Sequence, residues 1–164
     1  MNDECNIPAP YAHQKSTTDF IVKTKTCLIT SDPGTGKTRA VLDAHAILGG
    51  KTLVLAPLSI LEAAWGEDIS KFQPDIKYGV AYAKNRKQVF EDSENEMVIT
   101  NFEAVNFLQK NTHLIEKFDT VVIDEFTAFK NRQAKRSKNL NKIISYFTNR
   151  IAMSGTPNSN TILD

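Results

Sequence analysis

The chain contains only two cysteines, Cys5 and Cys27, which argues against a domain held together by disulfides. It also lacks any apolar stretch near the roughly 20 residues that a membrane-spanning helix requires. The amino terminus, MNDECNIPAP, is polar and acidic and has no charged-then-apolar secretory signal. These absences predict free thiols, no membrane partner and a cytoplasmic location, in a bacterium or in the host cytosol of a virus.

Acidic residues are almost missing from the last quarter of the chain. Up to Phe126 the sequence has 13 basic and 18 acidic residues, whereas residues 127–164 have seven basic residues and one acidic residue, Asp164. The net charge of +1 hides this asymmetry. The overall charge balance therefore does not exclude a polyanionic partner.

The 164 residues suffice for a single domain, 1–164, with an ordinary hydrophobic core. Short apolar runs rich in β-forming residues alternate with segments of helical spacing. The predicted strands are 27–30, 52–56, 78–82, 97–100, 120–124 and 150–154, and the predicted helices are 11–23, 37–48, 59–72, 84–92, 102–117 and 133–147. This alternation predicts an α/β three-layer sandwich, with a mostly parallel sheet, helices on both faces and ligands at the carboxyl ends of the strands.

The segment SDPGTGKT, residues 31–38, lies between a predicted strand and a predicted helix. It matches the phosphate-binding pattern GxxxxGK[ST] except that Ser31 replaces the first glycine. Backbone N–H groups of such a loop hold phosphates at the start of the following helix. We expect Lys37 to contact the β and γ phosphates and the Thr38 hydroxyl to bind Mg²⁺. The other residues expected at the nucleotide are Pro33, Gly34, Thr35 and Gly36. The alternative is a glycine-rich turn before a helix.

The segment VVIDEF supplies the carboxylates that a phosphate loop needs beside it. Asp124, at the end of a predicted strand, would hold Mg²⁺, and Glu125 would orient and deprotonate the attacking water. By itself an Asp-Glu pair after a strand is also compatible with a solvated turn or a helix cap. Together with the phosphate loop it predicts ATP and Mg²⁺ as cofactors and Lys37, Asp124 and Glu125 as catalytic residues.

Six blocks, in this order, resemble the first, RecA-like P-loop NTPase lobe of superfamily-two helicases, and within them the Swi/Snf-type DNA translocases. The blocks are PYAHQKSTTDFI (10–21), SDPGTGKT (31–38), LVLAPLSILEAAW (53–65), VITNFEAV (98–105), DEFTAFKN (124–131) and MSGTPNSN (153–160). The resemblance implies that Gln14 recognises adenine. It also implies that Ser154 and Thr156 couple hydrolysis to movement of a second motor lobe.

The third and fourth blocks resemble elements that grip a DNA backbone. Pro57 ends a predicted strand, and Ser59 at a helix N-cap would leave backbone N–H groups free for a phosphodiester. The Thr100 hydroxyl, at another strand end, could act in the same way without reading bases. An ordinary cap and strand end are the alternatives for Ser59 and Thr100. For Trp65, core packing is favoured over base stacking.

The segment KNRQAKRSKNLNKI contains no acid. A solvated helix face is the usual explanation of such a run, but the matching region of the resembling family faces nucleic acid. We therefore expect the cations to contact nucleic acid, with double-stranded DNA the form that the resemblance favours. They are Lys130, Arg132, Lys135 and Arg136. Neutralising phosphates in this way makes binding strongly dependent on salt.

Two departures from the family pattern bear on catalysis. Thr127 stands where the family has a histidine that bridges toward the second lobe, and the sequence stops shortly after the Ser-Gly-Thr-Pro block without a second lobe. That lobe, in the same or another chain, would supply an arginine finger worth roughly 10³ to 10⁵ in rate. We expect the isolated chain to bind ATP·Mg weakly and to hydrolyse it slowly or not at all. The alternatives are a small P-loop kinase and a non-catalytic module, binding nucleic acid or a motor, with a vestigial nucleotide site.

Overall fold

The computed structural model describes residues 7–30, 36–127, 129 and 134–155. Its six strands form one parallel sheet in the order β1-β6-β5-β2-β4-β3. The strands are β1 (Thr26–Thr30), β2 (Thr52–Ala56), β3 (Tyr78–Ala81), β4 (Met97–Asn101), β5 (Thr120–Ile123) and β6 (Asn149–Ser154). Each of the six predicted strands is present, and the predicted parallel sheet is confirmed.

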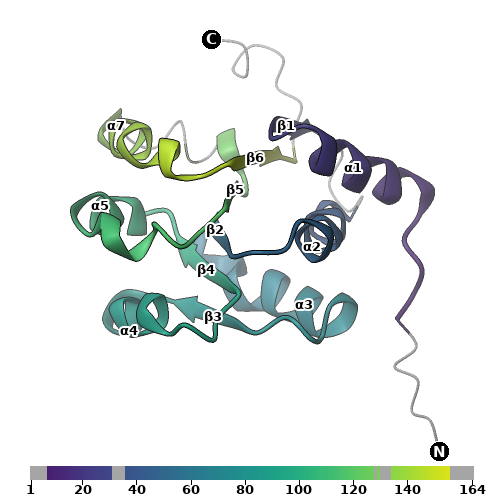
Figure 1. The fold of residues 1–164 in the computed structure, drawn as a ribbon, viewed down its shortest axis with the longest axis horizontal. Coiled ribbons are helices and arrows are strands. Elements are labelled where there is room, and N and C mark those ends of the chain that lie inside the picture. Colours follow the sequence, from purple (N-terminus) through teal and green to yellow (C-terminus); the bar gives the residue numbers. More distant parts are fainter. Residues whose placement is uncertain (1–6, 31–35, 128, 130–133, 156–164) are drawn as a thin grey trace, which may run out of the picture.

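Helices cover both faces of the sheet (Figure 1). One layer consists of α1 (Ala12–Lys23), α2 (Lys37–Leu48) and α3 (Glu67–Phe72), and the other of α4 (Arg86–Glu91), α5 (Ala104–Lys110) and α7 (Ala134–Ile143). Side chains of β2 alternate between the two layers because successive residues of a strand point to opposite faces. Leu53 and Leu55 join the core under α4, α5 and α7, whereas Val54 and Ala56 join the core under α1, α2 and α3. The predicted three-layer sandwich is therefore confirmed.

The segment predicted as one helix over 59–72 differs in the structure. It consists of a 3₁₀ turn at Leu58–Ile60, a π-helical segment at Leu61–Gly66 and then α3. The spacing of apolar residues does not separate these windings, because all of them return a side chain to the same face after three to five residues. This segment leads from the end of β2 into the helical layer beside the candidate site.

The helix predicted over 102–117 is also shorter than expected. α5 ends at Lys110, and a 3₁₀ turn follows at Thr112–Leu114. Asn111 ends the helix: its side-chain amide donates to the Phe107 carbonyl at 2.8 Å, and its backbone leaves the helical region. Asparagine competes for backbone acceptors in this way at helix ends.

The few cysteines and the absence of long apolar runs predict free thiols and no membrane-spanning helix. Cys27 has a free, half-buried thiol, and burial raises its pKa, whereas Cys5 lies outside the described residues. Over the part of the chain that the structure describes, every helix is too short or too polar to cross a bilayer.

Candidate nucleotide and nucleic-acid site

The carboxyl ends of neighbouring strands bring the predicted phosphate, metal and coupling motifs to one edge of the sheet. β6 lies between β1, which leads into the phosphate loop, and β5, which leads into the Asp-Glu pair. Thr30 at the end of β1 is the register partner of Ser154 at the end of β6, and Asp124 follows β5 directly. Ser154 therefore lies between the end of β1 and the segment that carries the two carboxylates, and Gly155 follows it directly.

Lys37 and Glu125 approach each other at Gly155. A Cβ atom placed on Gly155 would lie 3.2 Å from Glu125 Oε1 and 3.4 Å from Lys37 Nζ. Glu125 has a left-handed backbone, with φ of 56°, which costs a non-glycine residue on the order of 1–3 kcal/mol and is typical of functional sites. The structure thus brings together the ammonium predicted to contact phosphate and the carboxylate predicted to activate water.

Asp124 is a buried carboxylate, 7% exposed, that accepts a hydrogen bond from an indole. Trp65 Nε1 donates to Asp124 Oδ2 at 2.9 Å, and Trp65 is 0% exposed, which confirms its predicted place in the core. Burial raises the pKa of Asp124, the charge of Glu125 raises it further, and the Trp65 bond, the Glu125 backbone N–H and Lys37 lower it. Because burial disfavours its charged form, this carboxylate gains from a nearby cation.

The donor set at this edge fits Mg²⁺ held together with a nucleotide. Among the described residues, no group of three or more His, Cys, Asp or Glu side chains is placed to hold a metal by itself. Asp124 and the Thr38 hydroxyl, in the first turn of α2, are the protein oxygens that the sequence assigns to the ion. Mg²⁺ is typically bound by one or two protein oxygens, several waters and the phosphates of a nucleotide. The two residues fit that pattern.

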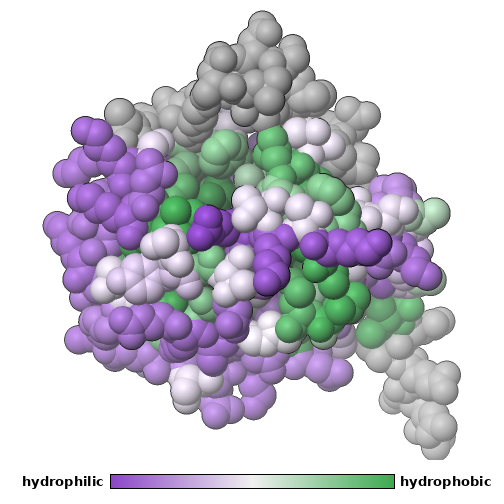
Figure 2. All heavy atoms as spheres, turned by 45° about the horizontal axis from the view of Figure 1, so that its top comes forward, coloured by the Kyte–Doolittle hydropathy of each residue, from purple (hydrophilic) through white to green (hydrophobic). Residues whose placement is uncertain are grey.

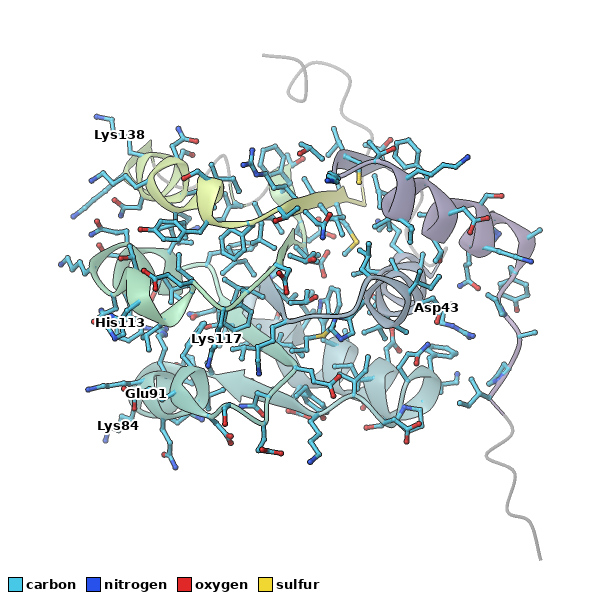
Figure 3. The ribbon with its side chains drawn as sticks, viewed as in Figure 1. Asp43, Lys84, Glu91, His113, Lys117 and Lys138 are labelled. Atoms are coloured by element: carbon cyan, nitrogen blue, oxygen red, sulfur yellow. The ribbon has the colours of Figure 1, made fainter. Side chains whose placement is uncertain are left out.

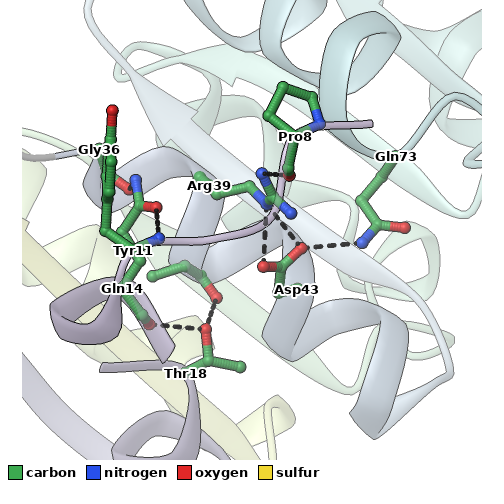
Figure 4. A network of polar contacts seen from close by, with 9 residues as sticks. Pro8, Tyr11, Gln14, Thr18, Gly36, Arg39, Asp43 and Gln73 are labelled. Atoms are coloured by element: carbon green, nitrogen blue, oxygen red, sulfur yellow. Dashed lines mark hydrogen bonds and ion pairs between the residues drawn. The ribbon is translucent and has the colours of Figure 1, made fainter. Parts of the chain in front are cut away.

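Gln14, predicted to recognise adenine, contacts the end of the phosphate loop. Its Oε1 accepts from the Tyr11 backbone N–H at 2.8 Å, and its Nε2 donates to the Gly36 carbonyl at 3.4 Å (Figure 4). The oxygen and the nitrogen of the amide are therefore both hydrogen-bonded, the oxygen to the residue before α1 and the nitrogen to the residue before α2. Three other predicted nucleotide ligands, Pro33, Gly34 and Thr35, lie outside the described residues.

A polar network fixes α2, whose first turn carries the predicted phosphate and metal ligands. The buried Arg39 pairs with Asp43 at 2.9 Å and donates to the Pro8 carbonyl at 2.9 Å (Figure 4). Gln73, which follows α3, donates to Asp43 at 2.8 Å, and the Arg39 guanidinium lies 4.5 Å from the centre of the Phe72 ring. These contacts hold α2 between the segment before α1 and the end of α3.

The two predicted coupling motifs touch inside this lobe. Thr127, at the position where the resembling family has histidine, lies 3.1 Å from the buried Ser154, hydroxyl to hydroxyl. The threonine therefore keeps a direct contact between the Asp-Glu block and the Ser-Gly-Thr-Pro block. Thr156 lies outside the described residues.

The strand ends predicted to contact nucleic acid differ from one another. Pro57 follows the last residue of β2, as predicted. It is also the residue that caps the following 3₁₀ turn, and its carbonyl oxygen accepts a hydrogen bond from the Ile60 N–H at 3.1 Å. The predicted N-cap at Ser59 is therefore wrong, although Ser59 is exposed. Thr100 is 0% exposed and its hydroxyl donates to the Ala81 carbonyl at 2.7 Å, so in this structure the side chain bonds within the sheet.

Lys135 and Arg136 line a groove of about 480 Å³ formed mainly by α5 and α7. Arg86 and Lys110 also line it, as does the acidic Glu103. Hydrophilic side chains cover the side of the molecule with α4, α5 and α7, on the left in Figure 2, and Lys138 points outward from α7 in Figure 3. Lys130 and Arg132 lie outside the described residues. The predicted basic surface therefore includes two cations, Arg86 and Lys110, that sequence reasoning missed, because no local motif joins these segments.

Arg86 is a half-buried guanidinium without an ion pair to any described carboxylate. Its Nη2 donates to Asn101 Oδ1 at 2.9 Å, and its buried Nε has no hydrogen-bond partner in the part of the chain that the structure describes. Burial lowers the pKa of Arg86, and the nearby Glu103 raises it. Because burying a cation without a matching anion is costly, Arg86 would gain from an anion in the groove.

Comparison with known proteins places these features in a family. The pattern of the family described as SNF2-related domain matches residues 12–164. An uncharacterized ATP-dependent helicase of Mycoplasma genitalium is 32% identical over 147 residues, which is 84% of this chain and 14% of the relative. The chromatin-remodeling ATPase INO80 of Aspergillus fumigatus is 30% identical over 154 residues, which is 82% of this chain and 9% of the relative. The chain thus spans a small part of the curated relatives it matches.

Solved structures show the same fold. The SWI2/SNF2 ATPase core of Sulfolobus solfataricus, in complex with double-stranded DNA, has a TM-score of 0.77 at 24% identity, covering 95% of this chain and 34% of that one. The UvsW helicase of bacteriophage T4 has a TM-score of 0.69 at 15% identity, covering 91% of this chain and 53% of that one. The similarity confirms the predicted RecA-like architecture.

Proposed function

Because the chain belongs to the SNF2-related domain family, we propose that it is the ATP-binding and DNA-binding first lobe of a Swi/Snf-like translocase or helicase. The observation that carries the proposal is the meeting of Lys37, Glu125 and the buried Asp124 beside β6. Relatives named as an ATP-dependent helicase and a chromatin-remodeling ATPase support nucleotide use. A structural neighbour solved with double-stranded DNA supports the nucleic-acid partner.

In this proposal, different residues at the carboxyl edge of the sheet bind the phosphates, hold the metal ion and activate the water. Lys37 binds the β and γ phosphates, and Asp124 with Thr38 holds Mg²⁺, which when bound neutralises charge on the phosphates. Glu125, held beside Gly155 by its left-handed backbone, orients a water and accepts its proton. Pro33, Gly34, Thr35 and Gly36 contribute the phosphate loop.

Hydrolysis at a useful rate requires a second lobe, in the same or another chain. An arginine finger contributes roughly 10³ to 10⁵ in rate to related phosphoryl transfers. Of the arginines in this lobe, Arg39 bonds to Asp43, Arg86 to Asn101, and Arg150 to the Phe147 carbonyl. Arg136 lines the groove of α5 and α7, and Arg132 lies outside the described residues. Since the described guanidinium groups have contacts away from the phosphate site, we propose that the chain alone binds ATP but turns it over slowly.

The groove formed by α5 and α7 is the proposed contact with the DNA backbone. Lys110, Lys135 and Arg136 offer charge at its surface, and Arg86 offers a partly desolvated guanidinium. Contacts of this kind position a duplex without reading its bases. Lys130, Arg132 and the turn at Pro57–Ile60 extend the proposed interface.

A non-catalytic module that binds nucleic acid or a motor is the second candidate function. The observation that favours it is Gln14, whose amide is already bonded to Tyr11 and Gly36. If this arrangement persists with nucleotide present, adenine is left one N–H of Nε2 and one lone pair of Oε1, half of the bonding capacity of the amide. The two candidates differ in whether the chain binds ATP at all.

The test measures equilibrium binding of labelled ATP·Mg and labelled duplex DNA, separately and together. We expect Lys37→Ala to weaken ATP·Mg binding at least tenfold, because it removes a charge-assisted contact to phosphate. The control Lys77→Ala also removes one positive charge, from an exposed lysine that pairs with Glu94 at the opposite edge of the sheet, and should leave ATP binding unchanged. If Lys37→Ala binds ATP·Mg as tightly as the wild type does, the nucleotide site is vestigial.

The same titrations test the DNA surface. Lys135→Ala should weaken duplex binding for every sequence and lower the slope of log K against log salt by about one. Lys77→Ala again serves as the charge-matched control. A slope that is equal in both variants would place the DNA contact away from the groove.

A further inference from the structure

Trp65 makes a contact that the proposed roles do not use. Its indole is buried beneath the layer of α1, α2 and α3, yet its N–H points to Asp124, fifty-nine positions later in the sequence, with a distance of 2.9 Å between Nε1 and Oδ2. An indole N–H only donates, so it can hold a carboxylate in one orientation but cannot replace it as a metal ligand. Residues that hold a metal ligand in this way tune metal affinity without touching the ion.

The helix that carries Trp65 has an unusual winding. The chain passes from the 3₁₀ turn Leu58–Ile60 directly into the π-helical segment Leu61–Gly66 and then into α3. π-helical segments are rare and occur frequently at functional sites. Here the wide turn sets the direction of the indole, since rewinding it would rotate Trp65 relative to Asp124.

The same segment begins at the molecular surface. Leu58 is exposed, Ser59 is exposed, and Pro57 connects them to the central strand β2. Trp65 lies in the π-helical segment that follows this short turn directly, so continuous helical backbone joins the two. The segment therefore joins a surface near the proposed DNA path to the proposed metal carboxylate.

We propose that Trp65 is a positioning residue, which orients the Asp124 carboxylate for Mg²⁺ and links it to the exposed turn Leu58–Ile60. The inference rests on the proposed metal role of Asp124 and adds to it a route by which DNA contact affects nucleotide binding. The route consists of one continuous chain segment and one hydrogen bond.

The variant Trp65→Phe keeps an aromatic ring and removes the N–H donor. We expect the Mg²⁺ concentration for half-maximal ATP binding to rise about 10- to 100-fold, the usual effect of losing a residue that supports a metal ligand. Binding of ATP in EDTA should stay within about twofold, because Asp124 does not act there. The control Ile69→Val removes a methyl group from the same core and should leave both measurements unchanged.

Trp65 is the single tryptophan of the chain, so tryptophan emission reports on the surroundings of this residue alone. In the wild type, ATP·Mg should shift the emission, ATP in EDTA should not, and adding duplex DNA to the ATP·Mg complex should shift it again. A Trp65→Phe variant with the wild-type Mg²⁺ requirement, or with equal losses in Mg²⁺ and EDTA, would overturn the positioning role. Bound duplex without an emission change would overturn the link to the turn. A wild-type chain that binds no ATP·Mg would instead contradict the proposed function.

Discussion

Gly36 illustrates how closely the first residues of the site are packed. Its φ of +78° lies in the left-handed region, and a Cβ atom at this position would lie 2.0 Å from Gln14 Nε2. The backbone therefore favours glycine here, and the neighbouring amide adds a second reason for a residue without a side chain. A larger residue at this position would be strained by its backbone and would require the Gln14 side chain to move.

We predict that Gly36→Ala destabilises the fold by more than the roughly 1–2 kcal/mol expected for a left-handed non-glycine residue. The excess comes from the collision with Gln14. In a Gln14→Ala background the same substitution should cost only the conformational part, and urea unfolding of the four chains measures the difference. Equal costs in both backgrounds would show that the amide moves aside freely.

Single residues also show the limits of reading this site from sequence. Lys37, Asp124 and Glu125 were found because phosphate chemistry requires these types at fixed places around strand ends. The bond from Trp65 to Asp124 joins residues far apart in the chain, and no spacing rule predicts it. Thr100 looked like a ligand because it ends a strand, but its hydroxyl satisfies the Ala81 carbonyl of the neighbouring strand.

Two helices each contain an ion pair between residues four positions apart. The pair in α2 is buried, whereas the pair in α4 is exposed. Arg39 and Asp43 are mostly buried and share further partners, whereas Lys87 and Glu91 are exposed and 3.8 Å apart. Surface pairs of this kind contribute about 0.5 kcal/mol or less. Removing one partner of a buried pair leaves a costly unpaired charge.

We predict that Asp43→Ala lowers the free energy of unfolding by about 3 kcal/mol, because it leaves Arg39 and Gln73 without their acceptor. Glu91→Ala, which breaks the exposed pair at the same spacing, should change it by less than about 0.5 kcal/mol. Chemical denaturation at pH 7 compares the two. Similar losses in both variants would mean that the α2 network adds nothing beyond a surface pair.

The strands were easier to predict than the helices for a physical reason. β2 and β4 are buried at every position, and the uninterrupted apolar runs at 53–56 and 97–99 indicate such strands directly. The helical segments depend on where hydrogen bonding changes from one winding to another. Neither the π-helical segment Leu61–Gly66 nor the early end of α5 at Asn111 is encoded in apolar spacing.

For the molecule as a whole, His45 ties stability to pH. It is buried near the end of α2, with Nδ1 2.7 Å from the Thr52 hydroxyl and Nε2 3.8 Å from the carboxylate of Glu96. Burial lowers the pKa of His45, while the charge of Glu96 and its hydrogen bond raise it in part. Folding therefore favours the neutral ring.

We predict that stability falls as the pH drops below about 6.5, where the unfolded chain begins to bind a proton that the folded chain excludes. The loss should continue down to the lower pKa of the folded state and be absent above pH 7. Replacing His45 with glutamine should flatten this part of the profile, and urea unfolding between pH 5 and 7.5 measures it. A profile that His45→Gln leaves unchanged would assign the dependence to other groups.

The strand order has a consequence for how the protein is made. In the described sheet β1 pairs with β6 alone, so its only neighbour begins at Asn149. On the ribosome, β1 precedes β6, so its strand partner is missing until nearly the whole described chain has been synthesised. Such a distant pairing is slow to form, and it leaves an early strand open to contacts with other chains. The carboxyl edge at which Lys37, Asp124 and Ser154 meet is therefore completed only after β6 has been synthesised.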